Sequence, residues 1–120
     1  MTAADAVINR LLAVSVVSLT TPYATNRAMQ RVVDGRAPAA GAKQSAKDCL
    51  VMESVFETLS LARASGFAAP AYFLSANLAE YADETKRGLH EDLVPEFAAL
   101  NLAFAKNYLE LRFDRTIANL

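Results

Sequence analysis

The chain has 120 residues, enough for one hydrophobic core and too few for two, so we expect a single domain over residues 1–120. Apolar residues make up 53% of it, a high share that favours an oligomer or a partner surface over an isolated monomer. The formal net charge of −1 argues against a nucleic-acid-binding protein, and a single cysteine excludes an intrachain disulfide or a cysteine-based metal cluster.

The charges are unevenly distributed along the chain. Six cations stand against two anions through Lys47, whereas six cations stand against eleven anions from Asp48 onward. The basic part contains no Lys/Arg cluster of the kind that binds phosphates. The asymmetry therefore indicates that the two parts of the chain attract one another, within or between molecules.

The first predicted helix opens with Thr2 and Asp5, which have the spacing of a capping box. Its apolar run, Leu11–Leu19, is about half of the ~20 residues that a bilayer-spanning helix needs. Asp5 and the lack of a clear cleavage motif after this run favour a helix over a secretory signal. We therefore expect no membrane span and a cytoplasmic protein.

A second helix is predicted from Thr21, a capping residue followed by Pro22, to Gly35, which is typical of a helix end. Residues 34–45 carry small side chains and Pro38, a composition typical of a mobile loop. Arg27 and Arg31 are four residues apart in the predicted helix. An alternative interpretation makes them part of a DNA-binding helix-turn-helix, although no more basic recognition helix accompanies them.

Three further helices are predicted after this loop. One begins at a second capping box, Ser45 with Asp48, and ends at Gly66, with a stripe of apolar residues every three or four positions. Another covers residues 67–88 and ends at Gly88, and the last runs from about Leu93 to the C-terminus. The predicted fold is all-α, a four- or five-helix bundle or a compact orthogonal helical array.

The only histidine, His90, lies in the stretch TKRGLHEDLVPEF, where carboxylates and cations gather. A metal or acid–base site there is one interpretation, but one histidine cannot supply a paired-imidazole motif. The other interpretation is a helix start, with Asp92 as the cap and Pro95 in the first turn. We favour the helix start, and we interpret Cys49 as a buried thiol rather than a nucleophile.

No catalytic, cofactor-binding or metal-binding motif is recognisable, so we predict a non-enzymatic protein without a cofactor. The size and helical layout are similar to those of small bacterial export chaperones and phage or flagellar accessory proteins, a likeness of fold alone. The leading hypothesis is an adaptor- or chaperone-like interaction protein that also forms a homo-oligomer. Its candidate interaction surface comprises Phe97, Leu100, Phe104, Tyr108, Leu111 and Phe113.

The alternative is a small-molecule sensor or carrier, whose helical bundle would enclose an apolar cavity. Large and adaptable side chains at interior positions are the basis for this alternative. The candidate cavity residues are Met52, Phe56, Phe73 and Tyr81.

Overall fold

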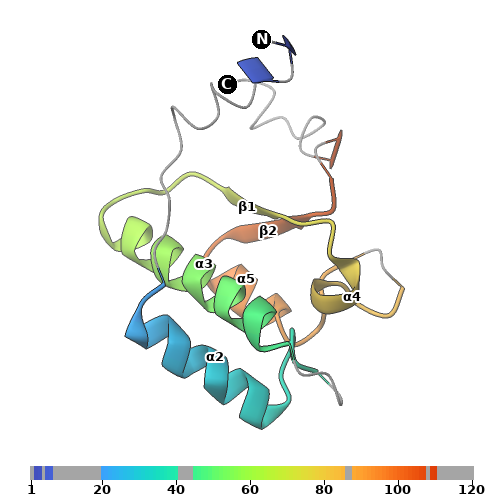
Figure 1. Cartoon of the computed structure of the whole chain (residues 1–120). Coiled ribbons are helices and arrows are strands. Elements are labelled where there is room, and N and C mark those ends of the chain that lie inside the picture. Colours follow the sequence, from blue (N-terminus) through green and yellow to red (C-terminus); the bar gives the residue numbers. More distant parts are fainter. Residues whose placement is uncertain are drawn as a thin grey trace.

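The fold is mixed helix and strand, not all-α. In the computed structural model the described residues are 2–3, 5–6, 20–40, 45–85, 88–107 and 109–110. Two long helices, α2 (Pro22–Asp34) and α3 (Ala46–Ala64), are followed by β1 (Ala71–Leu74), α4 (Leu78–Tyr81), α5 (Val94–Ala99) and β2 (Leu102–Ala105). Helix α3 lies between α2 on one side and the two strands on the other (Figure 1). The prediction of an all-α helical bundle is therefore wrong.

Helix α2 begins and ends where its sequence predicts. The Thr21 hydroxyl accepts a hydrogen bond from the backbone N–H of Ala24 at 3.1 Å, and Pro22 occupies the first turn. Gly35 ends the helix in the left-handed conformation, with φ of 65°. The predicted N-terminal capping box is also confirmed, because Thr2 and Asp5 exchange two hydrogen bonds of 3.1 Å. From position 7 onward, the helix predicted to follow this box lies outside the described residues.

Helix α3 buries the predicted apolar stripe, including Cys49, Met52, Phe56 and Leu59. Its predicted capping box is wrong. The Ser45 side chain makes no cap hydrogen bond, and its hydroxyl points to the carboxylate of Glu80, to which it donates. Packing against the segment around α4 thus replaces the local cap.

The predicted helix over residues 67–88 is wrong, because β1 forms there. Strand β1 pairs in parallel with β2, with Tyr72 opposite Ala103 and Phe73 opposite Phe104. The short helices α4 and α5 provide the crossover that two parallel strands require. Parallel strands are usually covered on both faces and show little alternation of polar and apolar residues, which is why the sequence pattern did not reveal them.

The predicted C-terminal helix starts close to its expected position, as α5, but the prediction that it continues is wrong, because α5 ends at Ala99 and β2 follows. Asn101 adopts a φ of 50°, a left-handed conformation that Asn tolerates better than most residues, and the chain turns there into β2. The later part of that predicted helix, residues 111–120, lies outside the described residues.

The link between α4 and α5 also differs from its prediction. Gly88 does not end a helix; its carbonyl accepts a hydrogen bond from the Asp83 N–H at 2.9 Å, beside an antiparallel bridge between Ala82 and Leu89. Asp92 does not cap α5, because its carboxylate accepts from the Ala37 N–H at 3.0 Å. Pro95 does occupy the first turn of α5, as predicted.

The main core lies between α3, the strands and α5. Its buried members are Ala37, Met52, Phe56, Leu59, Tyr81, Leu93, Phe97 and Leu102. Ala37, Pro38 and Ala39 are buried although they belong to the predicted loop, so the part of the loop before residue 41 packs into the protein. No described helix is long and apolar enough to cross a membrane.

Candidate binding cleft

A buried ion network joins α2, α3 and α5. Nε of the Arg31 guanidinium donates to Oε1 of Glu53 at 2.8 Å, and both side chains are inaccessible to solvent. Arg31 also donates to the carboxylate of Glu96 and to the backbone carbonyl of Ala37. Because these partners come from three parts of the chain, one guanidinium fixes the spacing of α2, α3 and α5.

A second arginine completes the pairing of Glu53. Nε of Arg27 donates to Oε2 of Glu53 at 3.0 Å, and its guanidinium lies 5.6 Å from the centre of the Tyr23 ring. The hydrogen bond from Arg27 to Glu53 and the carboxylate charge raise the pKa of Arg27 further above its usual value. Both arginines are thus engaged with Glu53, which counts against the helix-turn-helix interpretation of this pair.

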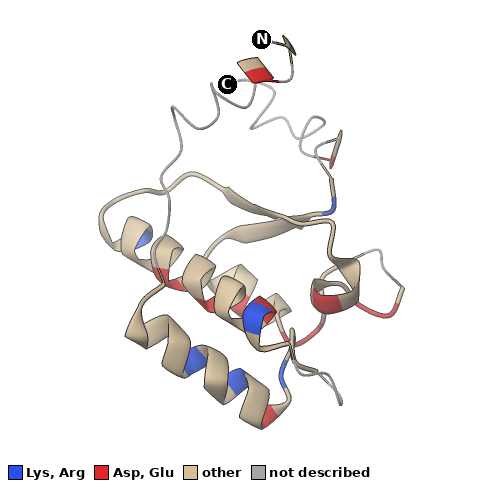
Figure 2. Cartoon of the chain, viewed as in Figure 1, with Lys and Arg blue, Asp and Glu red and all other residues tan. Residues whose placement is uncertain are grey.

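These pairs connect the basic first part of the chain with its acidic second part, as the charge asymmetry predicts. Figure 2 shows basic positions along α2 and acidic positions along α3. The pairing is intramolecular for Arg27, Arg31, Glu53 and Glu96.

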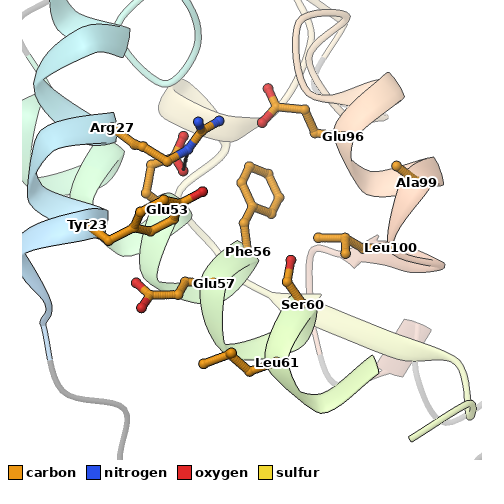
Figure 3. A pocket seen from close by; sticks show the side chains of 10 residues that line it. All are labelled: Tyr23, Arg27, Glu53, Phe56, Glu57, Ser60, Leu61, Glu96, Ala99 and Leu100. Carbon is orange, nitrogen blue, oxygen red and sulfur yellow. Dashed lines mark hydrogen bonds and ion pairs between the residues drawn. The ribbon is translucent and has the colours of Figure 1, made fainter. Parts of the chain in front are cut away.

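Beside this network, α2, α3 and α5 enclose a cleft with a volume of about 480 Å³. Helix α2 contributes two side chains, α3 five, and α5 with the residue after it three (Figure 3). The lining residues are Tyr23, Arg27, Glu53, Phe56, Glu57, Ser60, Leu61, Glu96, Ala99 and Leu100. The volume lies within the range of about 300–1,000 Å³ that is usual for ligand sites.

The cleft combines an apolar floor with exposed apolar side chains. Phe56 is buried, with its ring edge-on to Phe97 at 5.7 Å between centroids. Tyr23 is 57% exposed and Leu61 is 64% exposed. Large apolar side chains that line a cleft and remain this accessible are available to bind another molecule.

The three carboxylates of the cleft differ in how they are neutralised. Each oxygen of Glu53 accepts from one guanidinium. Glu96 binds Arg31 through Oε2, while its Oε1 is buried without a hydrogen bond from any described residue and lies 3.9 Å from Nη1 of Arg36. Glu57 accepts from the Thr21 hydroxyl at 2.5 Å and forms no ion pair with a described residue. Among the described residues, the partner of the Glu57 carboxylate is thus the neutral hydroxyl of Thr21.

Only three of the six residues of the predicted interaction surface lie among the described residues. Phe97 is buried in the core, and Phe104 is half-buried on β2, stacked on Phe73 with 6.2 Å between the ring centres. Leu100 lines the cleft. Tyr108, Leu111 and Phe113 lie outside the described residues. An interaction surface made of these six residues stays a prediction.

The four candidate cavity residues lie in or against one core cluster. Met52, Phe56 and Tyr81 are buried, and Phe73 packs against them with its ring edge-on to Tyr81 at 5.0 Å. Of the four, Phe56 alone lines the cleft. Binding of a ligand by these residues stays a prediction.

The two residues considered for chemistry have structural partners. Nδ1 of the His90 ring accepts a hydrogen bond from the backbone N–H of Asp92 at 3.1 Å. The backbone N–H of His90 donates to the backbone carbonyl of Tyr81 at 2.8 Å. Cys49 is buried, and this burial raises the pKa of its thiol. Among the described residues, no group of three or more His, Cys, Asp or Glu side chains is arranged to bind a metal ion.

A second groove lies across α3 from the cleft, between α3 and the sheet. Its volume is about 510 Å³, and Val51, Val55, Leu59 and Ala71 are among its apolar lining residues. Among the described residues, Lys47 is its only charged lining residue. This α3–sheet groove therefore has no carboxylate among its described lining residues, in contrast to the cleft.

The cleft is not predicted from the sequence alone, although Glu53 is a sequence signal that points to it. Glu53 follows Met52 on the buried stripe of α3, and a carboxylate there requires a cationic partner. Arg27 and Arg31, one turn apart on α2, match that requirement. The contributions of Glu57, Leu61 and Ala99 depend on how α2, α3 and α5 pack, which local patterns do not specify.

No protein-family model matches this chain, and no curated protein or solved structure matches it at a significant level. Its function must therefore be inferred from its own residues.

Proposed function

We propose that this chain is a non-enzymatic, adaptor- or chaperone-like protein that binds a segment of a partner polypeptide in the cleft between α2, α3 and α5. The exposure of Tyr23 and Leu61 beside the buried Phe56 is the observation that carries this proposal. An apolar side chain of a partner would bury surface against all three, at about 25 cal/mol per Å² of apolar area removed from water. The Arg31–Glu53 ion pair would keep the cleft open when no partner polypeptide is bound.

The roles of the polar groups support binding rather than catalysis. Arg27 and Arg31 neutralise Glu53, and Nδ1 of His90 accepts a backbone hydrogen bond from Asp92. Burial keeps the Cys49 thiol protonated, which opposes its use as a nucleophile.

We further propose that the protein forms a homo-oligomer in the cytoplasm. The apolar share of 53% supports self-association, and the single free cysteine suits a reducing compartment. Light scattering on the eluted peak together with native mass spectrometry tests this. We expect a dimer or a higher oligomer, and a monomer carrying a small-molecule adduct would favour the sensor or carrier alternative.

Selection from a random twelve-residue peptide library against the immobilised protein tests the cleft. We expect enriched peptides whose binding is weakened by Leu61→Asn and retained by the matched Val33→Asn, because Val33 is 73% exposed on α2 outside the cleft. Failure to enrich any peptide would contradict the proposal. Equal binding of the enriched peptides to both variants would contradict it as well.

A further inference from the structure

We infer that the polypeptide segment bound in the cleft presents a lysine or arginine next to an aliphatic side chain, and that Glu57 binds the cation. This inference rests on the proposed function and specifies the partner's chemistry. It follows from the charges of the cleft, the state of each carboxylate and the distribution of its apolar side chains.

The charge of the cleft lining favours a cation. Among the described residues, three carboxylates and one guanidinium line it. Glu53 and Glu96 are paired with arginines, which leaves Glu57 as the lining carboxylate without an ion pair. The lining guanidinium, on Arg27, donates through Nε to Glu53 and lies over the Tyr23 ring, so it is held in place. Near Glu57, which forms no ion pair with a described residue, an anionic partner would be repelled, whereas a cationic partner would be attracted.

Glu57 is the carboxylate best able to bind this cation. Both oxygens of Glu53 are used by arginines, and Glu96 is attached to Arg31 with Arg36 nearby. Glu57 has only the Thr21 hydroxyl, on Oε2, among the described residues, so Oε1 keeps its full capacity to accept. Because Glu57 is half-buried, an ion pair there is screened less than one on the open surface.

The apolar lining explains why the cation should belong to an amphipathic side chain. Leu61, one turn beyond Glu57 on α3, and Leu100 across the cleft border the same space (Figure 3). Lysine and arginine have aliphatic stems that bury against such residues while the charged end reaches a polar group. A neighbouring aliphatic side chain of the same segment would pack on Tyr23 and Phe56.

The test uses three pools of acetylated hexapeptide amides that differ only at the third position, which is lysine, norleucine or glutamate. The second and fourth positions are leucine and the others are randomised. Each pool is titrated into ¹⁵N-labelled protein, and binding is followed at the backbone amides of Ser60 and Leu61. We expect the lysine pool to bind about two- to fivefold more tightly than the norleucine pool, and the glutamate pool to bind most weakly.

Glu57→Gln should remove the preference for lysine over norleucine, because no charge then remains to bind the ammonium group. The variant keeps an acceptor for the Thr21 hydroxyl, so the start of α2 should be preserved. If this variant did not fold, the inference would still be tested, because the lysine and norleucine pools are compared on the unmodified protein.

Equal affinity for lysine and norleucine at the cleft would overturn the inference and leave the proposed function intact. No shift at Ser60 or Leu61 with any pool would overturn both. n-Butylamine is the probe for a free amine ligand. If it bound as tightly as the lysine pool, the assignment to a polypeptide would be wrong.

Discussion

Arg31 and Glu53 form an ion pair inside the protein, with 2.8 Å between Nε and Oε1 and both side chains buried. Arg31 belongs to α2 and Glu53 to α3, so this pair fixes how the two longest described helices pack. The guanidinium also lies 5.5 Å from the centre of the Phe56 ring, which forms the floor of the cleft. The stability of the fold and the shape of the cleft thus depend on the same contact.

Glu53→Leu should lower the free energy of unfolding by about 3–5 kcal/mol, because it leaves a buried guanidinium with one fewer carboxylate. The double variant Arg31→Met with Glu53→Leu should regain at least half of that loss, since no buried cation then remains in the pair. Urea denaturation followed by circular dichroism measures both. Purely additive losses in the double variant would mean that the two residues are not coupled.

Thr21 should contribute to stability through two contacts, its cap on Ala24 and its hydrogen bond to Glu57. Thr21→Ala should lower the free energy of unfolding by about 1–2 kcal/mol, because both are lost. Thr21→Ser is the control and should retain most of the stability, since serine keeps the hydroxyl. Equal losses for alanine and serine in urea denaturation would show that the hydroxyl is not responsible.

Phe97 should be a core residue rather than part of an interaction surface. It is buried and packs edge-on against Phe56 and Phe73. Phe97→Ala should therefore lower the free energy of unfolding by about 3–5 kcal/mol. Val94→Ala, on the exposed side of α5, should change it by less than about 0.5 kcal/mol. Thermal unfolding of both variants is the measurement, and similar midpoints would contradict the packing described for α5.

Tyr81 should make the protein less stable at alkaline pH. Burial, reinforced by the nearby carboxylate of Asp48, raises the pKa of its phenol well above the usual value. Above about pH 10 the phenol ionises in the unfolded chain but stays protonated in the folded one, so stability present below that pH is lost as the pH rises. Urea denaturation between pH 8 and 11 should show a decline that is shallower in Tyr81→Phe, and identical slopes would contradict this linkage.

The helices that could be predicted from sequence are those whose limits are set locally. Thr21, Pro22 and Gly35 define α2 through capping and backbone conformation, and the apolar spacing around Met52 defines the buried face of α3. These signals act within a turn or two of the chain.

The strands could not be predicted, because their pairing depends on residues about 30 positions apart. Phe73 and Phe104 face each other in register across β1 and β2. Each four-residue strand also fits an apolar helical pattern, so periodicity alone favoured helix. Ser45 and Asp92 likewise have the right spacing for helix caps, but each has a distant partner, Glu80 and Ala37 respectively.

The position at which a peptide binds tests the central claim most directly. ¹⁵N-labelled protein would be titrated with a peptide obtained by library selection, and the backbone amide shifts would be mapped. We predict the largest shifts at Ser60, Leu61 and Ala99, on the two walls of the cleft formed by α3 and α5. Shifts concentrated instead at Val51 and Ala71 would place binding in the α3–sheet groove and contradict the account.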